Sequence, residues 1–552
     1  MTADQQRAYD RRWWMLGVLC LSLLIVFTGN SSLNVALPSL SRDLGATESQ
    51  LQWVVASYSL VFAGLLFSTG ALGDRFGRKG ALQFGLATFF VAAAAASQST
   101  EMWQIIGCRA LMGVGAAFIM PSTLSILVNV FPPGERAKAI AIWAATTGVA
   151  GSLGPLASGF LLTHFWFGSV FLINLPVIAV AFIGGWFLVP KSKDPDQGKL
   201  DPPGALLSIV GISSLVYALI QAPDKGWSSP STLAAFGVAA IVLTLFVLWE
   251  LHTDEPMLDI HFFRNPAFST GSSGMMLVFL SLYGVMFLLT QYFQLVLGYS
   301  PLDAAIRLLP MAPIMIIVAP LTPALSKRFG ANRAVAFGMV LISVGFALFS
   351  RVDLNTPYWY ILLALVPLTS GFAMSMSPMT AAIMSAVPSR RAGAGSAMND
   401  ATRELGAALG VAVLGSIAAS QYASHLHDAL KNIPASSRHA AGSSIAGALR
   451  AAEQLSAPAA RAFTLVARNA FVDGIHVAAI FGVVLTLLAA FLTNRFLPRT
   501  VVPEGAMHSP LDAIENTAEL GLGGVPPVFA DEPTDDSDDG VRVPVVEPAG
   551  GS

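Results

Sequence analysis

The chain has 552 residues, of which 54% are hydrophobic and 12% are charged, with a formal net charge of −2. The charged share is about half that of an ordinary soluble domain, so these residues cannot cover a water-soluble surface. The cations are scattered through short segments and only two cysteines are present, which excludes a nucleic-acid-binding stripe and a disulfide or zinc framework.

Apolar residues gather into blocks that are each long enough to cross the hydrocarbon layer of a bilayer, which takes about 20 helical residues. In chain order the blocks occupy residues 13–37, 51–73, 81–97, 103–129, 137–163, 169–189, 203–220, 232–251, 268–296, 304–325, 333–350, 357–379, 395–421 and 472–496. The sequence therefore predicts an all-α polytopic membrane protein with about fourteen transmembrane helices. We interpret the first block as a retained helix, because it lacks a signal-peptide cleavage site.

The lysines and arginines lie mostly on one side of these predicted spans. With an even span count, the two termini and the even-numbered loops hold twenty of the 31 cations. The short loops of the opposite side hold four, one long loop there holds five, and Arg109 and Arg403 lie inside spans. Because cytoplasmic loops are enriched in Lys and Arg, both termini are predicted to be cytoplasmic.

A nine-residue string occurs twice, 253 residues apart. Residues 69–77 read TGALGDRFG and residues 322–330 read TPALSKRFG, so six of the nine positions agree. The two copies end the second and the tenth predicted spans, as expected if spans 1–6 and 9–14 are duplicated halves. Spans seven and eight are then an inserted pair between two six-helix bundles.

These observations divide the chain into consecutive parts. We expect a cytoplasmic N-terminus at 1–12, an N-terminal six-helix bundle at 13–189, a linker with two inserted helices at 190–251, a C-terminal six-helix bundle at 268–496 with an extracytoplasmic loop at 422–471, and a cytoplasmic tail at 497–552. The loop is rich in Ala and Ser and could carry one or two surface helices. The tail holds eleven acidic residues against two arginines, so it cannot bury enough apolar surface to fold and is predicted to be disordered.

The turn between spans two and three carries the most specific string in the chain. It contributes Gly70, Asp74, Arg75, Gly77, Arg78 and Lys79. Glycine suits a tight reversal or a close backbone approach. Asp74 lies beside three cations, so this cluster can form ion pairs or hydrogen bonds with the end of a neighbouring helix. These contacts can break when the two helix bundles move relative to each other. The alternative to a conformational role is that the cations only keep this loop on the cytoplasmic side of the membrane.

Three charged residues lie in span thirteen at positions i, i+3 and i+4, namely Asp400, Arg403 and Glu404, so they share one helix face. Because one charge at a helix centre costs about 2.5–3.5 kcal/mol to insert, the three are expected to face the bundle interior or water. Buried carboxyls beside an arginine can bind and release a proton, as proton coupling requires. The alternative is a structural Arg–Glu pair near the cytoplasmic end.

Further strings lie elsewhere in the chain. Four are in predicted spans, namely RALMGVG at 109–115, GPLASG at 154–159, FLINLP at 171–176 and NDATRELG at 399–406, and PMLDI at 256–260 lies between spans eight and nine. Together with the turn motif, they resemble the signatures of the major facilitator superfamily, and within it the fourteen-span drug:proton antiporters of the QacA and SmvA type. The resemblance covers residues 13 to 500, and the acidic tail has no counterpart.

The resemblance implies a major facilitator fold and a multi-pass protein of the bacterial cytoplasmic membrane. It also implies a latch of the outward-open state at the turn motif, and a role in proton coupling for Arg109 and the span-thirteen charges. In span five it implies a kinked, closely packed helix at Gly154, Pro155 and Gly159. From chemistry alone, an arginine inside a span must find carbonyls, water or a carboxylate.

Three acids that QacA-like chains carry are missing here. The string NVALP at 34–38 is intact, but the position of the usual span-one aspartate is Gly29. The acidic positions of spans two and ten correspond to Ala56 and Met315. A cavity with fewer carboxylates offers less to a dication, so the quaternary-ammonium specificity is not transferred. Monocations, neutral lipophilic drugs and an endogenous lipid-like metabolite all stay open as substrates.

Polar, aromatic and methionine residues on the predicted inward faces could line an adaptable apolar cavity. They are Asn30, Asn34, Trp53, Tyr58, Phe62, Tyr283, Phe287, Gln291, Tyr292 and Met311. The alternative for each aromatic residue is that it packs between helices or lies at the membrane interface.

The sequence therefore predicts a monomeric, proton-coupled exporter of small lipophilic compounds such as drugs or dyes, working by alternating access in a lipid bilayer. It is not expected to be an enzyme or to hold a cofactor, because we find no metal-ligand cluster, nucleophile string or phosphate-binding loop. Two alternatives remain. One is an exporter of a dedicated metabolite or lipid, and the other is a non-transporting receptor or an accessory protein of envelope assembly.

Overall fold

The computed structural model describes residues 10–190, 192, 201–253, 256–387 and 392–499, and the regular elements within these ranges are all helices. Most of the predicted N-terminus, part of the linker and the acidic tail from residue 500 lie outside the described residues. The prediction of an all-α polytopic protein is confirmed.

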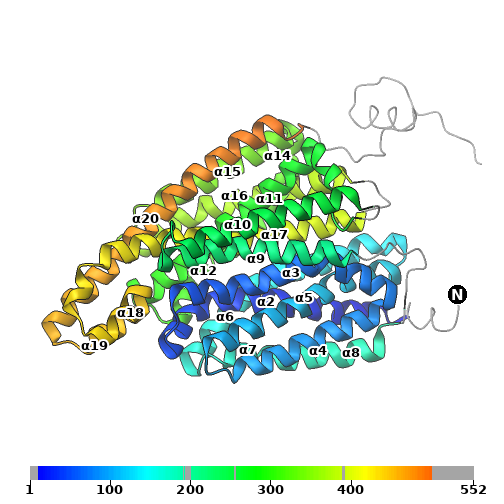
Figure 1. The fold of residues 1–552 in the computed structure, drawn as a ribbon. Coiled ribbons are helices and arrows are strands. Elements are labelled where there is room, and N and C mark those ends of the chain that lie inside the picture. Colours follow the sequence, from blue (N-terminus) through cyan, green and yellow to red (C-terminus); the bar gives the residue numbers. More distant parts are fainter. Residues whose placement is uncertain (1–9, 191, 193–200, 254–255, 388–391, 500–552) are drawn as a thin grey trace, which may run out of the picture. The chain divides into compact units, whose positions relative to one another are not determined.

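The first half of the chain forms the helices of the first six predicted spans (Figure 1). These are α2 (Arg12–Leu44), α3 (Glu48–Phe76), α4 (Arg78–Ser97), α5 (Met102–Val130), α6 (Pro133–His164), and α7 (Ser169–Leu172) with α8 (Asn174–Leu188). The inserted pair follows as α9 (Pro202–Lys225) and α10 (Pro230–His252).

The second half begins with a short 3₁₀ turn, η1, and ends with the longest helix. Its elements are η1 (Ile260–Arg264), α11 (Pro266–Gln291), the π-helical η2 (Tyr292–Val296), α12 (Pro301–Leu308), α13 (Met311–Val318), η3 (Ala319–Leu321), α14 (Thr322–Phe329), α15 (Ala331–Phe349), α16 (Tyr358–Ser385), α17 (Ala392–Leu426), η5 (Ala429–Asn432), α18 (Ala435–Ser443), α19 (Ile445–Glu453) and α20 (Ala457–Phe496).

Thirteen helical segments of the described ranges are long and apolar enough to cross a membrane. The 32-residue α6, which is not one of these thirteen, lies at the fifth predicted span. With it, every predicted apolar block has a helix. The tenth span, counted as one segment from Pro301 to Phe329, is broken into α12, α13, η3 and α14. Prolines at 310 and 320 lie at or beside these breaks, as expected of a residue that lacks the amide hydrogen.

The segment at 422–471, which the sequence predicted to be a loop, is largely helical. The start of α20 lies at Ala457, fifteen residues before the predicted start of span fourteen. The segment between α17 and α20 carries η5, α18 and α19 instead of an open loop, in agreement with the expected surface helices. Alanine-rich sequence favours helix wherever its backbone hydrogen bonds can continue, and this explains the difference.

The repeated nine-residue string has the same local structure in both halves. Gly77 separates α3 from α4 with φ = 117°, and Gly330 separates α14 from α15 with φ = 93°. Only glycine adopts such values at little cost. The next residue also repeats its contact, because the Arg78 amide donates to the Ser192 carbonyl (3.1 Å) and the Ala331 amide donates to the Arg499 carbonyl (2.9 Å).

The symmetry extends one residue further. Lys79 Nζ donates to the carbonyl of Trp186 (2.6 Å) on α8, and Asn332 Nδ2 donates to the carbonyl of Asn494 (3.1 Å) on α20. Each turn therefore donates a hydrogen bond to the last helix of its own half. This correspondence supports the duplication that the sequence predicted.

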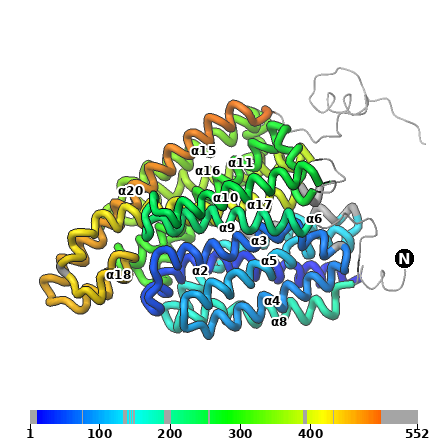
Figure 2. The backbone as a smooth tube through the Cα atoms, viewed as in Figure 1, coloured from blue at the N-terminus to red at the C-terminus, as the bar shows by residue number. Residues whose placement is uncertain are grey.

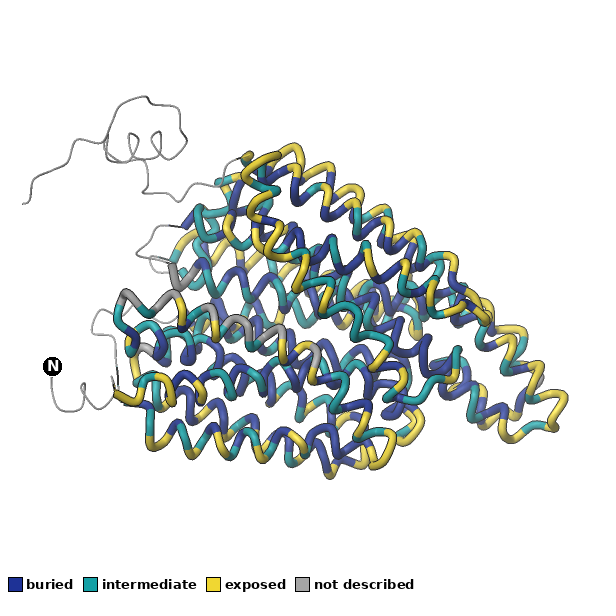
Figure 3. Tube along the Cα trace, turned by 180° about the vertical axis from the view of Figure 1, so that it is seen from behind, coloured by how far each residue is buried: buried dark blue, intermediate teal, exposed yellow. Residues whose placement is uncertain are grey.

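The inserted helix α9 packs against both halves, on α3 and on α17 (Figures 1 and 2). Ser49 Oγ on α3 donates to Asp224 Oδ2 (2.6 Å), and Ser416 Oγ on α17 donates to the carbonyl of Leu219 (2.6 Å). The second inserted helix, α10, packs on α9 and leaves large apolar residues exposed, among them Leu233 and Ile241. Such a face belongs in lipid, and Figure 3 shows exposed residues along the outer helices with buried residues inside.

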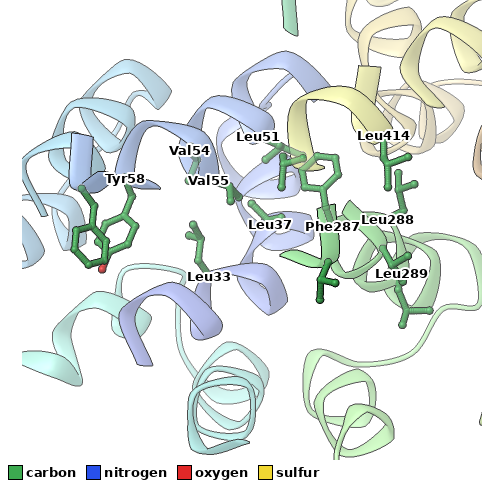
Figure 4. Close-up of a cluster of buried hydrophobic side chains, with 14 of the residues drawn as sticks. Leu33, Leu37, Leu51, Val54, Val55, Tyr58, Phe287, Leu288, Leu289 and Leu414 are labelled. Carbon is green, nitrogen blue, oxygen red and sulfur yellow. The ribbon is translucent and has the colours of Figure 1, made fainter. Parts of the chain in front are cut away.

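Apolar residues from both halves meet where α3 begins (Figure 4). Leu37 of α2 and Leu51 of α3 lie beside Phe287 of α11 and Leu414 of α17, and all four are fully buried. We call these four residues the apolar seal. Nearby, Gln294 Nε2 of η2 donates to the Val35 carbonyl of α2 at 2.9 Å. The two halves are therefore closed together at this end.

Candidate functional site

Arg109 on α5 is fully buried, as the sequence predicted for a cation inside a span. Its guanidinium donates to the carbonyls of Val54 (3.1 Å) and Gly29 (3.3 Å) and to Asn30 Oδ1 (3.3 Å). The Tyr58 ring lies 4.3 Å from Cζ. Three acceptors and an aromatic face replace the lost water, so the cation is satisfied without an acid in direct contact.

Asn30 connects this arginine to the other half of the chain. Its Oδ1 accepts from Arg109, and its Nδ2 donates to Tyr283 Oη on α11 at 3.4 Å. Because α2 and α5 belong to the first half and α11 to the second, the three side chains form one hydrogen-bonded path across the interface between the halves.

Glu404 on α17 reaches the same place from the second half. It is buried near the Ser59 hydroxyl, and its carboxylate interacts electrostatically with Asp400, Arg403 and Arg109 and with the Tyr58 and Tyr283 hydroxyls. Among the described residues Glu404 Oε2 has no hydrogen-bond partner. A buried carboxylate oxygen without a partner is costly, and a bound proton or cation would remove that cost. We call Arg109, Asn30, Tyr283 and Glu404 the polar junction.

Asp400 and Arg403 lie on the same face of α17 but pair with each other. Arg403 Nη1 is 3.4 Å from Asp400 Oδ1, and its Cζ lies 5.1 Å from the centre of the Phe279 ring. The ion pair of this helix is therefore Arg–Asp. The Arg–Glu pair that was the structural alternative is not the one formed, and Glu404 is left to the polar junction.

The sequence did not single out Asn399, which supports this pair. Its Nδ2 donates to Asp400 Oδ1 (3.4 Å), and its Oδ1 accepts from Thr380 Oγ1 of α16 (3.0 Å). The string NDATRELG contains Asn399, so the signal was present in the motif, but the amide was not given a role.

The structure accounts for the positions of the three missing acids. The carbonyl of Gly29 is bound by Arg109, and a side chain there would meet the Phe89 ring, 3.1 Å from an ideal Cβ. Ala56 is fully buried in a small apolar cluster with residues of α9 and α17. Met315 is half-buried on α13. Two of the three positions are thus used for packing in this conformation.

Most of the predicted cavity aromatics are enclosed in this conformation. Tyr58, Phe62, Phe287 and Tyr292 are fully buried. Phe287 belongs to the apolar seal, and the Tyr292 hydroxyl donates to the carbonyl of Asp353. Here these rings are packed between helices, so their role in substrate contact stays a prediction.

The remaining cavity residues are more varied. Trp53 is half-buried and its ring lies 6.3 Å from that of Tyr217 on α9. Gln291 Nε2 donates to Glu48 Oε1, and Asn34 Oδ1 is buried without a hydrogen-bond partner among the described residues. Met311, at the start of α13, is half-buried.

The turn motif is placed at the junction of α3 and α4, with its glycine and cations as described above. Gly70 lies on α3 with an ideal Cβ 3.7 Å from Pro121, and the Arg75 guanidinium lies 5.8 Å from the centre of the Phe76 ring. The side chain of Asp74 lies outside the described residues. The latch role therefore stays a prediction.

The three residues of the span-five motif lie in α6, which runs unbroken through Pro155. Gly154 packs against α2, because an ideal Cβ would overlap Ser31 Oγ, and its carbonyl accepts from Ser32 Oγ (3.2 Å). Gly159 packs against α12 of the other half, with an ideal Cβ 2.9 Å from Ala305 Cβ. These two glycines lie at close helix contacts, one within the first half and one between the halves.

A cavity of about 300 Å³ lies elsewhere, between the beginning of α11 and the end of α20. It is lined by Arg264, Ser269, Thr270, Ser273, Leu492 and Phe496 among others, and it contains no predicted site residue. Within the described ranges, no group of three or more His, Cys, Asp or Glu side chains could hold a metal ion.

Comparison with known proteins gives a consistent family. The family model described as Major Facilitator Superfamily matches residues 19–411. The multidrug efflux pump LfrA of Mycolicibacterium smegmatis is 36% identical over 490 residues, which cover 89% of this chain and 97% of LfrA. The methyl viologen resistance protein SmvA of Salmonella typhimurium is 33% identical over 469 residues, which cover 84% of this chain and 93% of SmvA.

Solved structures agree on the fold. A crystal structure of a bacterial homologue of the human lysosomal transporter Spinster, in an inward-facing and occupied conformation, aligns with a TM-score of 0.62. The alignment covers 88% of this chain and 97% of the homologue at 17% identity. At this identity the likeness concerns the helical arrangement alone.

Proposed function

The chain belongs to the Major Facilitator Superfamily, and on that premise we propose that it exports small lipophilic compounds in exchange for protons by alternating access. The names of its relatives, a multidrug efflux pump and a resistance protein, support export of drugs. The family and the fold make it a multi-pass membrane transporter and not an enzyme. We place it in the bacterial cytoplasmic membrane as a monomer, with both termini in the cytoplasm because of the cation distribution.

The observation that carries this proposal is the polar junction. Four side chains from α2, α5, α11 and α17 meet between the halves, and one of them is a buried carboxylate with an unpartnered oxygen. Charged groups are retained inside a membrane protein mainly where they serve ion or substrate pathways. Structural ion pairs do not explain Glu404, because the nearest arginine on its helix pairs with Asp400.

The geometry supports a simple order of events. In the conformation described here the halves touch at the apolar seal, which lies on the extracytoplasmic side in the proposed orientation. A proton on Glu404 removes one negative charge beside Arg109, and its loss restores that charge. Because the path from Arg109 through Asn30 ends on Tyr283, a change in charge at Glu404 acts on a contact between the two halves. Proton binding and rocking are thereby linked.

The test is transport by purified protein in sealed proteoliposomes with an imposed pH gradient. Glu404→Gln and Asp400→Asn are expected to abolish gradient-driven uptake of a fluorescent dye while substrate exchange without a gradient persists. Asp303→Asn on α12 is the matched control, because that carboxylate is exposed and pairs with Arg307 at the surface. Gradient-driven transport that survives both site variants would contradict proton coupling at α17.

The substrate class is tested with the same vesicles and a panel of dyes, monocations and dications. We expect transport of neutral and monocationic compounds, because the positions of three usual acids are occupied by Gly29, Ala56 and Met315. A wild-type protein that transports no compound of the panel would favour the alternative of a dedicated metabolite. Profiling the medium of cells with and without the protein would then identify that metabolite.

A further inference from the structure

Glu48, the first residue of α3, is a second buried carboxylate between the halves. It is 7% exposed, and its Oε1 accepts a hydrogen bond from Gln291 Nε2 of α11 at 2.9 Å. The contact joins residues 243 apart in the sequence and lies beside the apolar seal. An acid at such a place is part of the closed interface, and it must separate from its partner whenever that interface opens.

The hydrogen bonding of the Gln291 amide indicates which protonation state of Glu48 fits the closed interface. Its nitrogen is used, but its Oε1 is buried and has no hydrogen-bond partner among the described residues. An ionised carboxylate can only accept hydrogen bonds, whereas a protonated carboxyl both accepts and donates. The neutral acid can therefore satisfy both ends of the amide, and the anion can satisfy only one.

The charges around Glu48 also favour the neutral acid in the closed conformation. Among the described residues, the titratable groups that interact with it are Asp224 from α9 and Tyr422 from α17, neither of which is a cation. A carboxylate buried without a cation is costly. Once the halves part and water enters, hydration stabilises the anion. The two conformations thus favour opposite protonation states.

We propose that Glu48 is a proton-binding site on the extracytoplasmic side. It takes a proton from external water while the halves are apart there, and the neutral acid pairs with the Gln291 amide as that side closes. The proton returns to external water when the side opens again at higher pH. This inference rests on the alternating access and the orientation of the proposed function, and it adds external pH as a control on closing.

The experiment measures how fast a cysteine in the apolar seal reacts with a membrane-impermeant maleimide added outside cells. The reporter is Leu51→Cys, one turn from Glu48, in a chain whose Cys20 and Cys108 are changed to Ala. Leu414→Cys on α17 is a second reporter, which guards against misfolding of the first. Rates are divided by that of Glu453→Cys, an exposed position on α19, so that the pH dependence of thiol reactivity cancels.

With Glu48 intact, the normalised rate is expected to fall as the external pH drops from about 8 to about 6, by up to about tenfold per pH unit for one titrating group. Glu48→Gln should react slowly at every pH, because its amide always donates. Gln291→Leu should react faster than the unsubstituted residue at low pH, because the neutral acid loses the amide with which it pairs. Asp303→Asn is the matched control, since that carboxylate is exposed on α12, pairs with Arg307 and should leave the response unchanged. A Glu48→Gln protein that keeps the original pH dependence overturns the proposal.

Failure of this proposal can be told from failure of the proposed function. If the chain exports dyes in vesicles but Glu48→Gln changes nothing, Glu48 is a structural residue and the transport function stands. If the labelling depends on pH through Glu48 but no compound is exported, the site stands and the proposed substrates are wrong. A reporter that never reacts at any pH overturns both.

Discussion

Substitution of Gly159 by alanine should open the extracytoplasmic side, because this glycine lets α6 touch α12 of the other half. An ideal Cβ at residue 159 would lie 2.9 Å from Ala305 Cβ, from the Leu302 Cα and from the Pro301 oxygen. Non-bonded carbon atoms pack best about 3.5–4.0 Å apart. Two of the three obstacles are backbone atoms, so the helices must separate to admit the methyl group.

The steric clash at Gly159→Ala sets the expected change in the population of the closed conformation. Overpacking a tight contact by one methyl group costs about 1–3 kcal/mol. Because the contact exists only where the halves touch, the cost falls on the closed state alone. The population of the closed conformation relative to the open one should therefore fall by about 5-fold to about 150-fold.

Two glycines of the same helix serve as controls. Gly151 has no heavy atom within 4 Å of an ideal Cβ, so Gly151→Ala changes only helix propensity, by up to about 1 kcal/mol. Gly154→Ala would meet Ser31 within the first half and should lower stability in every conformation. Comparing Gly159→Ala with Gly151→Ala cancels the propensity effect.

The assay is the labelling rate of Leu51→Cys in the apolar seal, measured beside the thermal unfolding temperature of each variant. Gly159→Ala should label faster than Gly151→Ala and unfold at a similar temperature. Equal labelling rates, or a loss of stability without faster labelling as expected for Gly154→Ala, would refute the inference that Gly159 sets the closed state.

Three further variants test the site and the turns. Arg109→Lys keeps the charge but cannot serve three acceptors with one ammonium group, so transport should fall at least about tenfold in vesicles. Gly29→Asp places an acid beside Arg109 and should raise the ratio of dication to monocation transport, provided that the Phe89 ring gives way. Gly77→Ala forces a left-handed φ on alanine and should cost about 1–2 kcal/mol of stability. Gly80→Ala, with no atom near its ideal Cβ, is the control in thermal unfolding.

The fold was predictable because its main determinant is local. A span needs a run of apolar residues, and such a run is visible without knowledge of its neighbours. The nine-residue repeat then predicted the duplication, which the matching turns at Gly77 and Gly330 support. Helix ends were less predictable, because α20 continues fifteen residues beyond the apolar block on Ala-rich sequence.

The site was predictable only in part. Arg109 and Glu404 stood out because charges inside apolar blocks are rare, and the structure brings both to one place. Glu48 did not stand out, since an acid in the first turn of a helix is common and favourable by itself. Its burial arises from contact with α11, far away in the sequence, and no local pattern reports such a contact.

The charges near the polar junction suggest how a proton and a cation would compete. Arg109 and Arg403 contribute two positive charges, while Asp400 and Glu404 contribute two negative charges when ionised. Their sum is zero without a proton and +1 with a proton on Glu404. A cationic substrate is therefore repelled from the protonated state and tolerated by the deprotonated one, as exchange requires.

The absence of acids at three positions limits how much positive charge the interior can stabilise. Aspartate or glutamate at residues 29, 56 and 315 would lower the sum by up to three units, which would favour dications. In this chain the amide of Asn30 binds Arg109 without neutralising it. An interior whose summed charge never falls below zero can release a monocation by binding one proton, but it does not stabilise a second positive charge. We therefore expect selectivity for neutral and singly charged compounds, because the proton proposed on Glu404 changes the same sum of charges that a cationic substrate meets.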